Sequence, residues 1–188
     1  MLHTGHTGDV RYAVVALLTA SILAAPTGAS GLDPKAFVLS PTDVPTGFRL
    51  DRDESGVRTN ELEARENPET RTLFDRWRRL TGYQARFERS GATIEARVDI
   101  FRGRDGARNL LAWVDREFLK AGVKGLKRAR AGVGSEGWVY SAGSSSGIAV
   151  VVWRYTRVWS GIAGTGLGRA RVLALARLQQ QRITAALR

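Results

Sequence analysis

The chain has 188 residues with 43% hydrophobic content, which is enough for one domain with a packed core, and its formal net charge is +11. It contains no cysteine, and its only histidines are His3 and His6. Beyond the first 30 residues this composition excludes disulfides, a Ser-His-Asp triad and the usual zinc and transition-metal sites, so we expect no metal and no cofactor.

The N-terminal segment has the pattern of a secretory signal peptide. Arg11 precedes an apolar run over residues 12–25, and small residues occupy positions 26–31. The run is shorter than the roughly 20 residues that a permanent membrane helix needs. We expect a signal peptide over residues 1–30 and a single extracytoplasmic domain over residues 31–188, with an uncleaved N-terminal membrane anchor as the alternative.

Two short strands and a helix are predicted next. Residues 37–40 and 48–53 have the composition of strands, whereas residues 54–66 are polar and without a period, which predicts a loop. Asn67 can cap a helix, because its side chain can accept a backbone N–H and the proline after it suits the first helical position. We expect this helix to end at Gly82. Its apolar stripe consists of Leu73, Phe74, Trp77 and Leu80.

An antiparallel hairpin is predicted over residues 83–100. Apolar and polar side chains alternate on both sides of a turn at Ser90-Gly91. This alternation predicts that one face of the hairpin is packed and the other face is in contact with solvent.

Three carboxylates, Glu88, Glu95 and Asp99, lie in this hairpin. A glycosidase needs two carboxylates that face each other across a cleft, so a carboxylate-based hydrolase is one interpretation. Arg86 and Arg97 share the polar face, however, and cross-strand ion pairs explain the same residues. We favour the ion pairs and do not expect an enzyme.

A second helix is predicted after the hairpin. Asp105 is its candidate cap, and Gly122 closes it. A basic connection over residues 124–130 follows. The apolar stripe of the helix consists of Ala107, Leu110, Leu111, Val114 and Phe118.

Three strands and a last helix complete the chain. Residues 138–141 and 158–163 predict strands, and the nearly all-apolar segment 148–153 predicts a central strand buried on both faces. Residues 144–147 predict a flexible turn, and residues 168–187 predict a helix. The expected order is β-β-α-β-β-α-β-β-β-α, an α+β fold in which about three helices pack on an antiparallel sheet.

Two short motifs have a structural and a functional interpretation. Residues 132–137 spell G-x-G-x-x-G, but a strand-like segment follows where a dinucleotide site needs a helix, so we favour a tight turn. Asp51, Asp53 and Glu54 offer oxygen ligands for calcium, but they lack the full ligand loop of an EF-hand. We favour a solvated strand edge at these residues.

Large aromatic side chains gather on the three C-terminal strands. Such rings bury well and can line a ligand pocket, and packing in the core is the alternative. Tyr155 and Trp159 flank Arg157 near a turn, so we expect these two rings to be the most exposed. The candidate ligand-binding residues are Trp138, Tyr140, Trp153, Tyr155 and Trp159.

The densest basic run follows the second helix. It offers an anion-binding surface, with a solvated loop as the alternative. Outside a cell its partners would be anionic lipid headgroups or acidic envelope polymers rather than nucleic acid. The candidate anion-binding residues are Lys120, Lys124, Lys127, Arg128 and Arg130.

Six segments carry a family resemblance: LSPTDVPTGF, YQARFERSGATIEARVDIF, GARNLLAWVDREF, VGSEGWVY, VVVWR and LALARLQQQRI. They resemble a widespread group of small secreted proteins of unknown function from actinobacteria and related bacteria. In layout this group is similar to the extracellular sensor domains of mycobacterial serine/threonine kinases and, more distantly, to PsbP-like domains. Those kinase domains carry disulfides, which this chain lacks. The resemblance implies the fold and the compartment, and it implies no catalytic residue.

The sequence therefore favours a secreted, non-enzymatic binding or sensing module of the bacterial cell envelope. Its expected ligand is a small apolar or amphipathic molecule such as a lipid, or a protein partner. The alternative is a basic, envelope-associated protein that binds anionic polymers.

Overall fold

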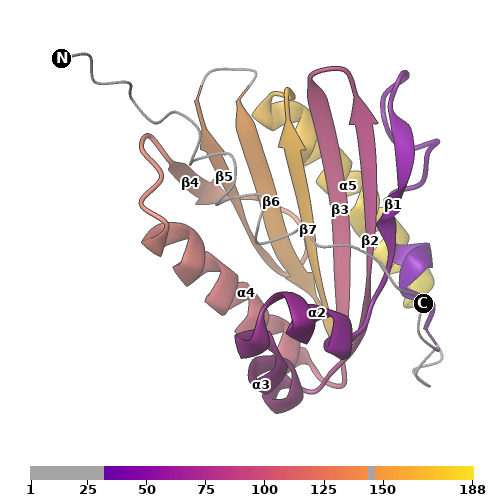
Figure 1. The fold of residues 1–188 in the computed structure, drawn as a ribbon, viewed down its shortest axis with the longest axis vertical. Coiled ribbons are helices and arrows are strands. Elements are labelled where there is room, and N and C mark those ends of the chain that lie inside the picture. Colours follow the sequence, from indigo (N-terminus) through magenta and orange to yellow (C-terminus); the bar gives the residue numbers. More distant parts are fainter. Residues whose placement is uncertain (1–31, 144–146) are drawn as a thin grey trace.

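The computed structural model describes residues 32–143 and 147–188, which form a seven-stranded antiparallel sheet with helices packed on it (Figure 1). The strands lie in the order β1-β2-β3-β7-β6-β5-β4. The predicted α+β class is therefore confirmed. The expected signal peptide and most of the expected turn over residues 144–147 lie outside the described residues.

The strands and helices have the following bounds. The strands are β1 Arg49–Arg58, β2 Arg79–Arg89, β3 Ala92–Phe101, β4 Lys127–Arg130, β5 Glu136–Ala142, β6 Ile148–Tyr155 and β7 Val158–Thr165. The helices are the 3-10 helix η1 Pro34–Phe37 and the α-helices α2 Asn60–Glu66, α3 Pro68–Trp77, α4 Arg104–Lys120 and α5 Arg169–Ala186.

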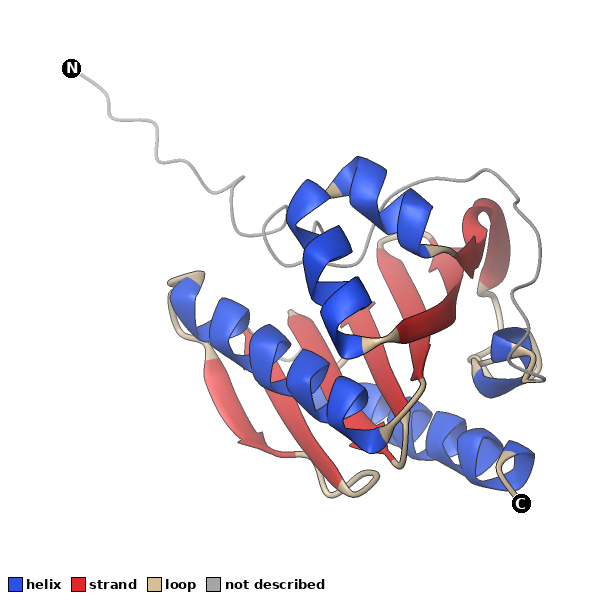
Figure 2. Cartoon of the chain, turned by 90° about the horizontal axis from the view of Figure 1, so that it is seen from below, coloured by secondary structure: helices blue, strands red, loops and turns tan. Residues whose placement is uncertain are grey.

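Helices cover both faces of the sheet (Figure 2). On one face α5 contacts β6, β7 and η1, and we call this the α5 face. On the other face α4 contacts β3, β6 and β7, while α2 contacts β2 and α3 contacts α4. We call this second face the α4 face. The strands β5, β6 and β7 therefore send alternate side chains into two separate cores.

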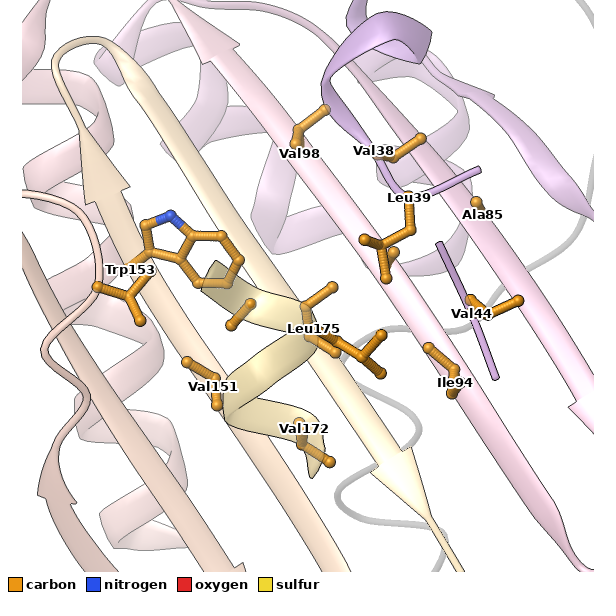
Figure 3. Packing of buried hydrophobic residues seen from close by; sticks show 14 of the residues in the cluster. Val38, Leu39, Val44, Ala85, Ile94, Val98, Val151, Trp153, Val172 and Leu175 are labelled. Atoms are coloured by element: carbon orange, nitrogen blue, oxygen red, sulfur yellow. The ribbon is translucent and has the colours of Figure 1, made fainter. Parts of the chain in front are cut away.

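The core of the α5 face is apolar (Figure 3). Val151 and Trp153 of β6 pack with Val172 and Leu175 of α5, and Ile94 of β3 lies in the same cluster. The other side chains of β6, at alternate positions, pack on the α4 face, so the predicted burial of this strand on both faces is confirmed. In α5 the side chains of Val172, Ala176 and Ile183 are buried against this face.

A fully buried glutamine fixes α5 to the sheet. The Oε1 atom of Gln179 accepts a hydrogen bond from the backbone N–H of Leu39 at 3.2 Å. Its Nε2 atom donates to the carbonyl of Arg97 at 3.2 Å and to Oγ of Ser160 at 2.6 Å. Because both ends of the amide have partners, this polar group is buried without an unsatisfied atom.

Two N-terminal segments differ from their predictions. Residues 37–40 do not form a strand, because η1 ends at Phe37 and the chain continues without regular structure. Residues 54–66 are not a loop, since they contain the end of β1 and all of α2. The strand continues past an irregularity at which the Asp51 carboxylate accepts the N–H groups of the second and third residues after it, at 3.0 and 3.2 Å.

The predicted basic connection also contains a strand. Lys127–Arg130 pairs with β5 as the edge strand β4. Its side chains are mostly charged and exposed, which hides the apolar alternation by which strands are recognised. Charged side chains on an edge strand also oppose association with the edge of another sheet.

The start of α3 agrees with the prediction and its end does not. Asn67 caps the helix, and its Oδ1 atom accepts a hydrogen bond from the backbone N–H of Glu69 at 3.1 Å. The helix ends at Trp77, because Arg78 adopts a left-handed conformation with φ of 56°. Gly82 therefore lies within β2 instead of closing the helix.

The predicted apolar stripe of α4 is buried as a whole, but Asp105 does not cap this helix. The cap residue is Gly103, so the N-terminus of this helix has no side-chain cap. Asp105 lies in the first turn and forms an ion pair with Arg108 at 2.9 Å.

Replacing Asn67 with alanine should lower the free energy of unfolding by about 1 kcal/mol, because the first turn of α3 loses its side-chain acceptor. Urea denaturation followed by tryptophan fluorescence measures this change. Asn109→Ala is the control, since Asn109 is exposed within α4 and should change stability by less than about 0.5 kcal/mol. Equal losses in the two variants would contradict the capping role.

Candidate ligand-binding site

The polar face of the hairpin β2–β3 is buried over most of its length, so its predicted contact with solvent is wrong except near the turn, where Glu88 is exposed. Glu95, Arg97 and Asp99 are 6%, 5% and 0% exposed, respectively. The reason is α2, a helix in the segment predicted as a loop, which contacts β2 and buries its own Glu63. The alternation separated the two faces of the hairpin correctly, but the polar face is also covered except near the turn.

Five charged residues form a network on this buried face. Asp99 accepts a hydrogen bond from Nε of Arg79 at 2.7 Å and another from Nε of Arg97 at 3.1 Å. Glu63 is 3.0 Å from Nη2 of Arg97 and 2.7 Å from Nε of Arg58. We call Arg58, Glu63, Arg79, Arg97 and Asp99 the ion-pair cluster.

Two neighbouring residues fit the cluster closely. Gly82 of β2 leaves room for it, since a Cβ atom there would lie 2.4 Å from Arg79 Nη2 and from Asp99 Oδ1. Asn60 of α2 accepts a hydrogen bond from Arg79 Nη1 at 2.7 Å and donates to the Arg79 carbonyl at 3.1 Å. The cluster thus joins α2 to the sheet through polar contacts.

The ion-pair cluster remains charged although it is buried. Burial alone would raise the pKa of Glu63, but Arg97, Arg79 and Arg58 outweigh this effect and lower that pKa to about 2. Burial would likewise lower the pKa of Arg97, but Asp99 and Glu63 raise it. The two signs of charge therefore stabilise each other in this core.

Three buried polar atoms beside this cluster have no hydrogen-bond partner among the described residues: Gln84 Oε1, Glu95 Oε1 and Trp159 Nε1. The side chains of Gln84, Glu95 and Trp159 all lie on the α4 face of the sheet. Unsatisfied buried polar atoms are rare in folded proteins, and each of them needs an explanation. We call these three residues the Glu95 site.

The strand register gathers the Glu95 site around Arg97. Gln84 lies opposite Arg97 on β2, and Glu95 is the preceding residue on the same face of β3. Gly161 lies opposite Arg97 on β7, and the Trp159 ring extends over this glycine, whose Cβ would lie 3.1 Å from Cη2 of the ring. Gln84 and Glu95 are diagonal neighbours, a relation that corresponds to a separation of about 7–8 Å.

The Glu95 site adjoins the molecular surface. Three residues next to Glu95 on this face, Arg86, Thr93 and Ala163, are partly exposed. The carboxyl group is therefore buried but close to solvent. The Gln84 amide is oriented by its Nε2 atom, which donates to the Glu54 carbonyl at 3.3 Å, so Oε1 is the atom that remains without a partner within the described part of the chain.

Glu95 differs from the carboxylates of the cluster in its ionisation. Burial raises the pKa of Glu95 to about 7, although the charges of Arg97, Arg86 and Arg58 act against this rise. Arg86 lies directly opposite Glu95 but binds Glu88 at 2.7 Å. The expected cross-strand pairing thus gives way to a pair within β2, and near neutral pH Glu95 exists in both protonation states.

The five aromatic residues predicted to bind a ligand do not share one surface. Trp138, Tyr140 and Trp159 belong to the α4 face, whereas Trp153 and Tyr155 belong to the α5 face. The expected exposure of Trp159 is wrong, since β7 is a central strand and this side chain is 2% exposed. Tyr155 is partly exposed. Binding by these rings stays a prediction.

Two arginines of the edge strand β4 pack over the ring of Trp138. The guanidinium groups of Arg128 and Arg130 lie 3.4 and 3.9 Å from the centre of its ring. Arg128 also donates two hydrogen bonds of 2.7 Å to Asp115 of α4, and the Tyr140 hydroxyl donates to the same carboxylate. These contacts fasten β4 and β5 to α4.

The predicted basic run is exposed but partly neutralised. Lys120, Arg128 and Arg130 form ion pairs with carboxylates of α4 and β5. Lys127 is exposed at the start of β4, and Lys124 is exposed in the turn before this strand. Anion binding by these residues stays a prediction. Because three of the five form ion pairs, fewer positive charges are available for an anion than the sequence suggests.

The G-x-G-x-x-G segment forms a turn. Gly132 and Gly134 have φ values of 63° and 66°, and β5 follows them rather than a helix. The structural interpretation of this motif is confirmed.

Two general properties concern the described residues alone. Over residues 32–143 and 147–188, no three or more His, Cys, Asp or Glu side chains are grouped so that they could hold a metal ion. In the same ranges no helix combines the length and hydropathy needed to cross a membrane.

Sequence reasoning named Glu95 and Trp159 but did not connect them, and it missed Gln84. The available signal was the mixture of charges on the polar face of the hairpin. Acids and arginines at neighbouring positions of two paired strands can neutralise each other and be buried together. Solvent-facing residues need no such balance.

Comparisons with known proteins find a similarity to a solved structure but none to a family model or a curated protein. No family model matches the sequence, and no curated protein matches it. Among solved structures, the chain is similar to the crystal structure of the extracellular domain of PknH from Mycobacterium tuberculosis, with a TM-score of 0.49 and 11% identity over 84% of this chain and 98% of that chain. The expected similarity to such kinase domains stays a prediction, as does the resemblance to PsbP-like domains.

Proposed function

We propose that this chain is a non-enzymatic, extracytoplasmic binding or sensing module whose ligand occupies the Glu95 site. The observation that carries the proposal is the set of three buried atoms, Gln84 Oε1, Glu95 Oε1 and Trp159 Nε1, that have no partner within the described residues. Each such atom costs about 1–3 kcal/mol when its hydrogen bond with water is not replaced. A small molecule that supplies these partners recovers that free energy on binding.

The surroundings of the site support an amphipathic ligand. Ala163 lies beside Glu95 and is partly exposed, and it packs with the apolar core of the α4 face, which also contains Val150 and Val152. A ligand with a polar group on Glu95 and an apolar body along Ala163 would satisfy both surfaces.

Binding rather than catalysis is favoured by the residues available. Beyond the expected signal peptide the sequence contains no histidine and no cysteine, and among the three residues of the Glu95 site only Glu95 carries a carboxyl group. Extracytoplasmic placement rests on the signal-like N-terminal sequence and means that the ligand comes from outside the cytoplasm.

Native mass spectrometry of the mature chain, purified gently from a bacterial relative of the source, tests this proposal. A retained small molecule, lost in the Glu95→Ala variant, is the expected result. A bare chain at its calculated mass, unchanged after exposure to an extract of the envelope, would refute the proposed function.

The Trp159→Phe variant should retain about fivefold to tenfold less of the bound molecule, because it removes the indole N–H that serves as a donor to the ligand. Trp153→Phe is the matched control. Trp153 is equally buried, but it lies on the α5 face and its Nε1 atom already donates to Gln180 at 2.7 Å. The same native mass spectra give both occupancies. A larger loss in the control than in Trp159→Phe would contradict the assignment of the site.

A further inference from the structure

We infer that the Glu95 site takes a small molecule with one protonated amino group, held by Glu95 and Gln84, and with a neutral hydrogen-bond acceptor that reaches Trp159. This inference rests on the proposed function, because it names the ligand class of the same site. The inference is carried by the absence of an ion pair to Glu95 among the described residues and by the kinds of unpartnered atoms that the site presents.

The ion pairs around the site form without Glu95. The three arginines of the ion-pair cluster are matched by three carboxylates: the two of the cluster and Glu66, which pairs with Arg58. The neighbouring Arg86 pairs with Glu88. An ionised Glu95 is therefore a buried negative charge without an ion pair among the described residues. A ligand with a single positive charge neutralises it, whereas a neutral or anionic ligand does not.

The unpartnered atoms specify where the ligand needs donors and where it needs an acceptor. Gln84 Oε1 and Glu95 Oε1 are both acceptors, and their residues are diagonal neighbours on β2 and β3. An ammonium group has three donors and can serve both oxygens. Trp159 Nε1 is a donor, so the other end of the ligand requires an oxygen or another acceptor.

Binding of an amine should be coupled to the ionisation of Glu95. The charged groups that face this carboxyl are Arg97 of β3, Arg86 of β2, and Arg58 and Glu54 of β1. Burial raises the pKa of Glu95 to about 7, so an amine binds the ionised form and releases a proton at lower pH. Its affinity should therefore rise as the pH increases from 5 to 8.

A set of three short probes separates charge from shape. Aminopentanol, pentanediol and hydroxypentanoate have the same chain length and one common hydroxyl, and their other ends are cationic, neutral and anionic. The five tryptophans each give an indole N–H signal in a nitrogen–proton NMR spectrum, and the Trp159→Phe variant identifies the signal of Trp159. Titration of this signal measures binding at the site, and the Trp153 signal on the opposite face serves as the internal control.

The expected result is that aminopentanol shifts the Trp159 signal with an affinity at least about tenfold higher than that of pentanediol, and that the Glu95→Gln variant abolishes this preference. Equal or tighter binding of pentanediol or hydroxypentanoate would overturn the amine inference, as would an affinity that does not change with pH. Absence of any shift would overturn it as well. The proposed function is decided separately, by whether native mass spectrometry finds a retained molecule that depends on the Glu95 site.

Discussion

Replacing Asp99 with alanine is expected to lower the free energy of unfolding by about 3–5 kcal/mol, the largest effect that we expect from a single change in this chain. Asp99 and its partner Arg79 have fully buried side chains. Without the carboxylate, Arg79 and Arg97 keep their charges in the interior and lose the acceptor that they share. Removing one partner of a buried ion pair costs this much because the other charge is left uncompensated. Urea denaturation at constant pH, followed by tryptophan fluorescence, measures the loss.

The control for this prediction is Asp105→Ala. Asp105 forms an ion pair with Arg108 at 2.9 Å, but the two side chains are 81% and 61% exposed. Surface pairs of this kind contribute no more than about 0.5 kcal/mol, because solvent screens them. If Asp99→Ala lost no more stability than Asp105→Ala, the ion-pair cluster would not be the structural anchor of α2 that its contacts indicate.

The hairpin β2–β3 shows what alternation predicts and what it leaves open. Alternation identified Ile94, Ala96 and Val98 as one apolar face, and these side chains are buried on the α5 face. It cannot tell what covers the opposite face, since polar side chains occur both in solvent and in buried, paired networks. The polar face of this hairpin is shielded from solvent by α2, and the sequence pattern predicted a loop instead of this helix.

The aromatic residues were misplaced for a different reason. Trp138 and Tyr140 share a face because they are two residues apart on β5, and Trp153 and Tyr155 share a face on β6 for the same reason. The register of the hairpin β5–β6 decides whether the aromatic side chains of the two strands lie on the same face of the sheet. In this register Tyr140 pairs with Val150. A register shift of one residue would move Trp153 to the other face, and the sequence alone does not fix this register.

The candidate site combines residues whose individual positions were predictable with contacts that were not. The strand positions of Glu95 and Trp159 followed from local patterns. Their polar atoms remain without partners in the described structure because neighbouring side chains bind other groups. Arg86, for example, pairs with Glu88. Which partner a side chain binds depends on the packing of three strands and two helices, so no local sequence pattern predicts it.

Keeping an unpaired carboxyl group in the interior lowers stability, which is a common property of functional sites. The ion-pair cluster shows that this fold can satisfy buried carboxylates, since Glu63 and Asp99 each contact two arginines. Glu95 lies beside the same arginines and lacks such contacts among the described residues. Its exceptional position is the physical reason to assign it to a ligand rather than to the architecture.

In the ligand-free protein, stability should fall as the pH rises from about 4.5 to about 7. Burial raises the pKa of Glu95 from 4.5 to about 7, so in this range the folded state holds a proton that the unfolded state has released. The stabilisation is complete below the pKa of the unfolded state and is lost as the pH rises through the folded value. The difference between the two values corresponds to about 3 kcal/mol. Urea denaturation at a series of pH values measures it.

The Glu95→Gln variant isolates this effect, because it replaces the carboxyl with a neutral group of the same shape. Its stability should equal that of the unmodified protein near pH 4.5 and exceed it by about 3 kcal/mol at pH 8. Glu63 acts in the opposite direction and in another range. Its pKa is lowered to about 2, so its contribution is present above about pH 4.5 and is lost only as the pH falls toward 2. Parallel stability profiles for the two proteins between pH 5 and 8 would show that Glu95 is ionised as easily in the folded chain as in the unfolded one. The buried carboxylate on which the amine inference depends would then already be compensated.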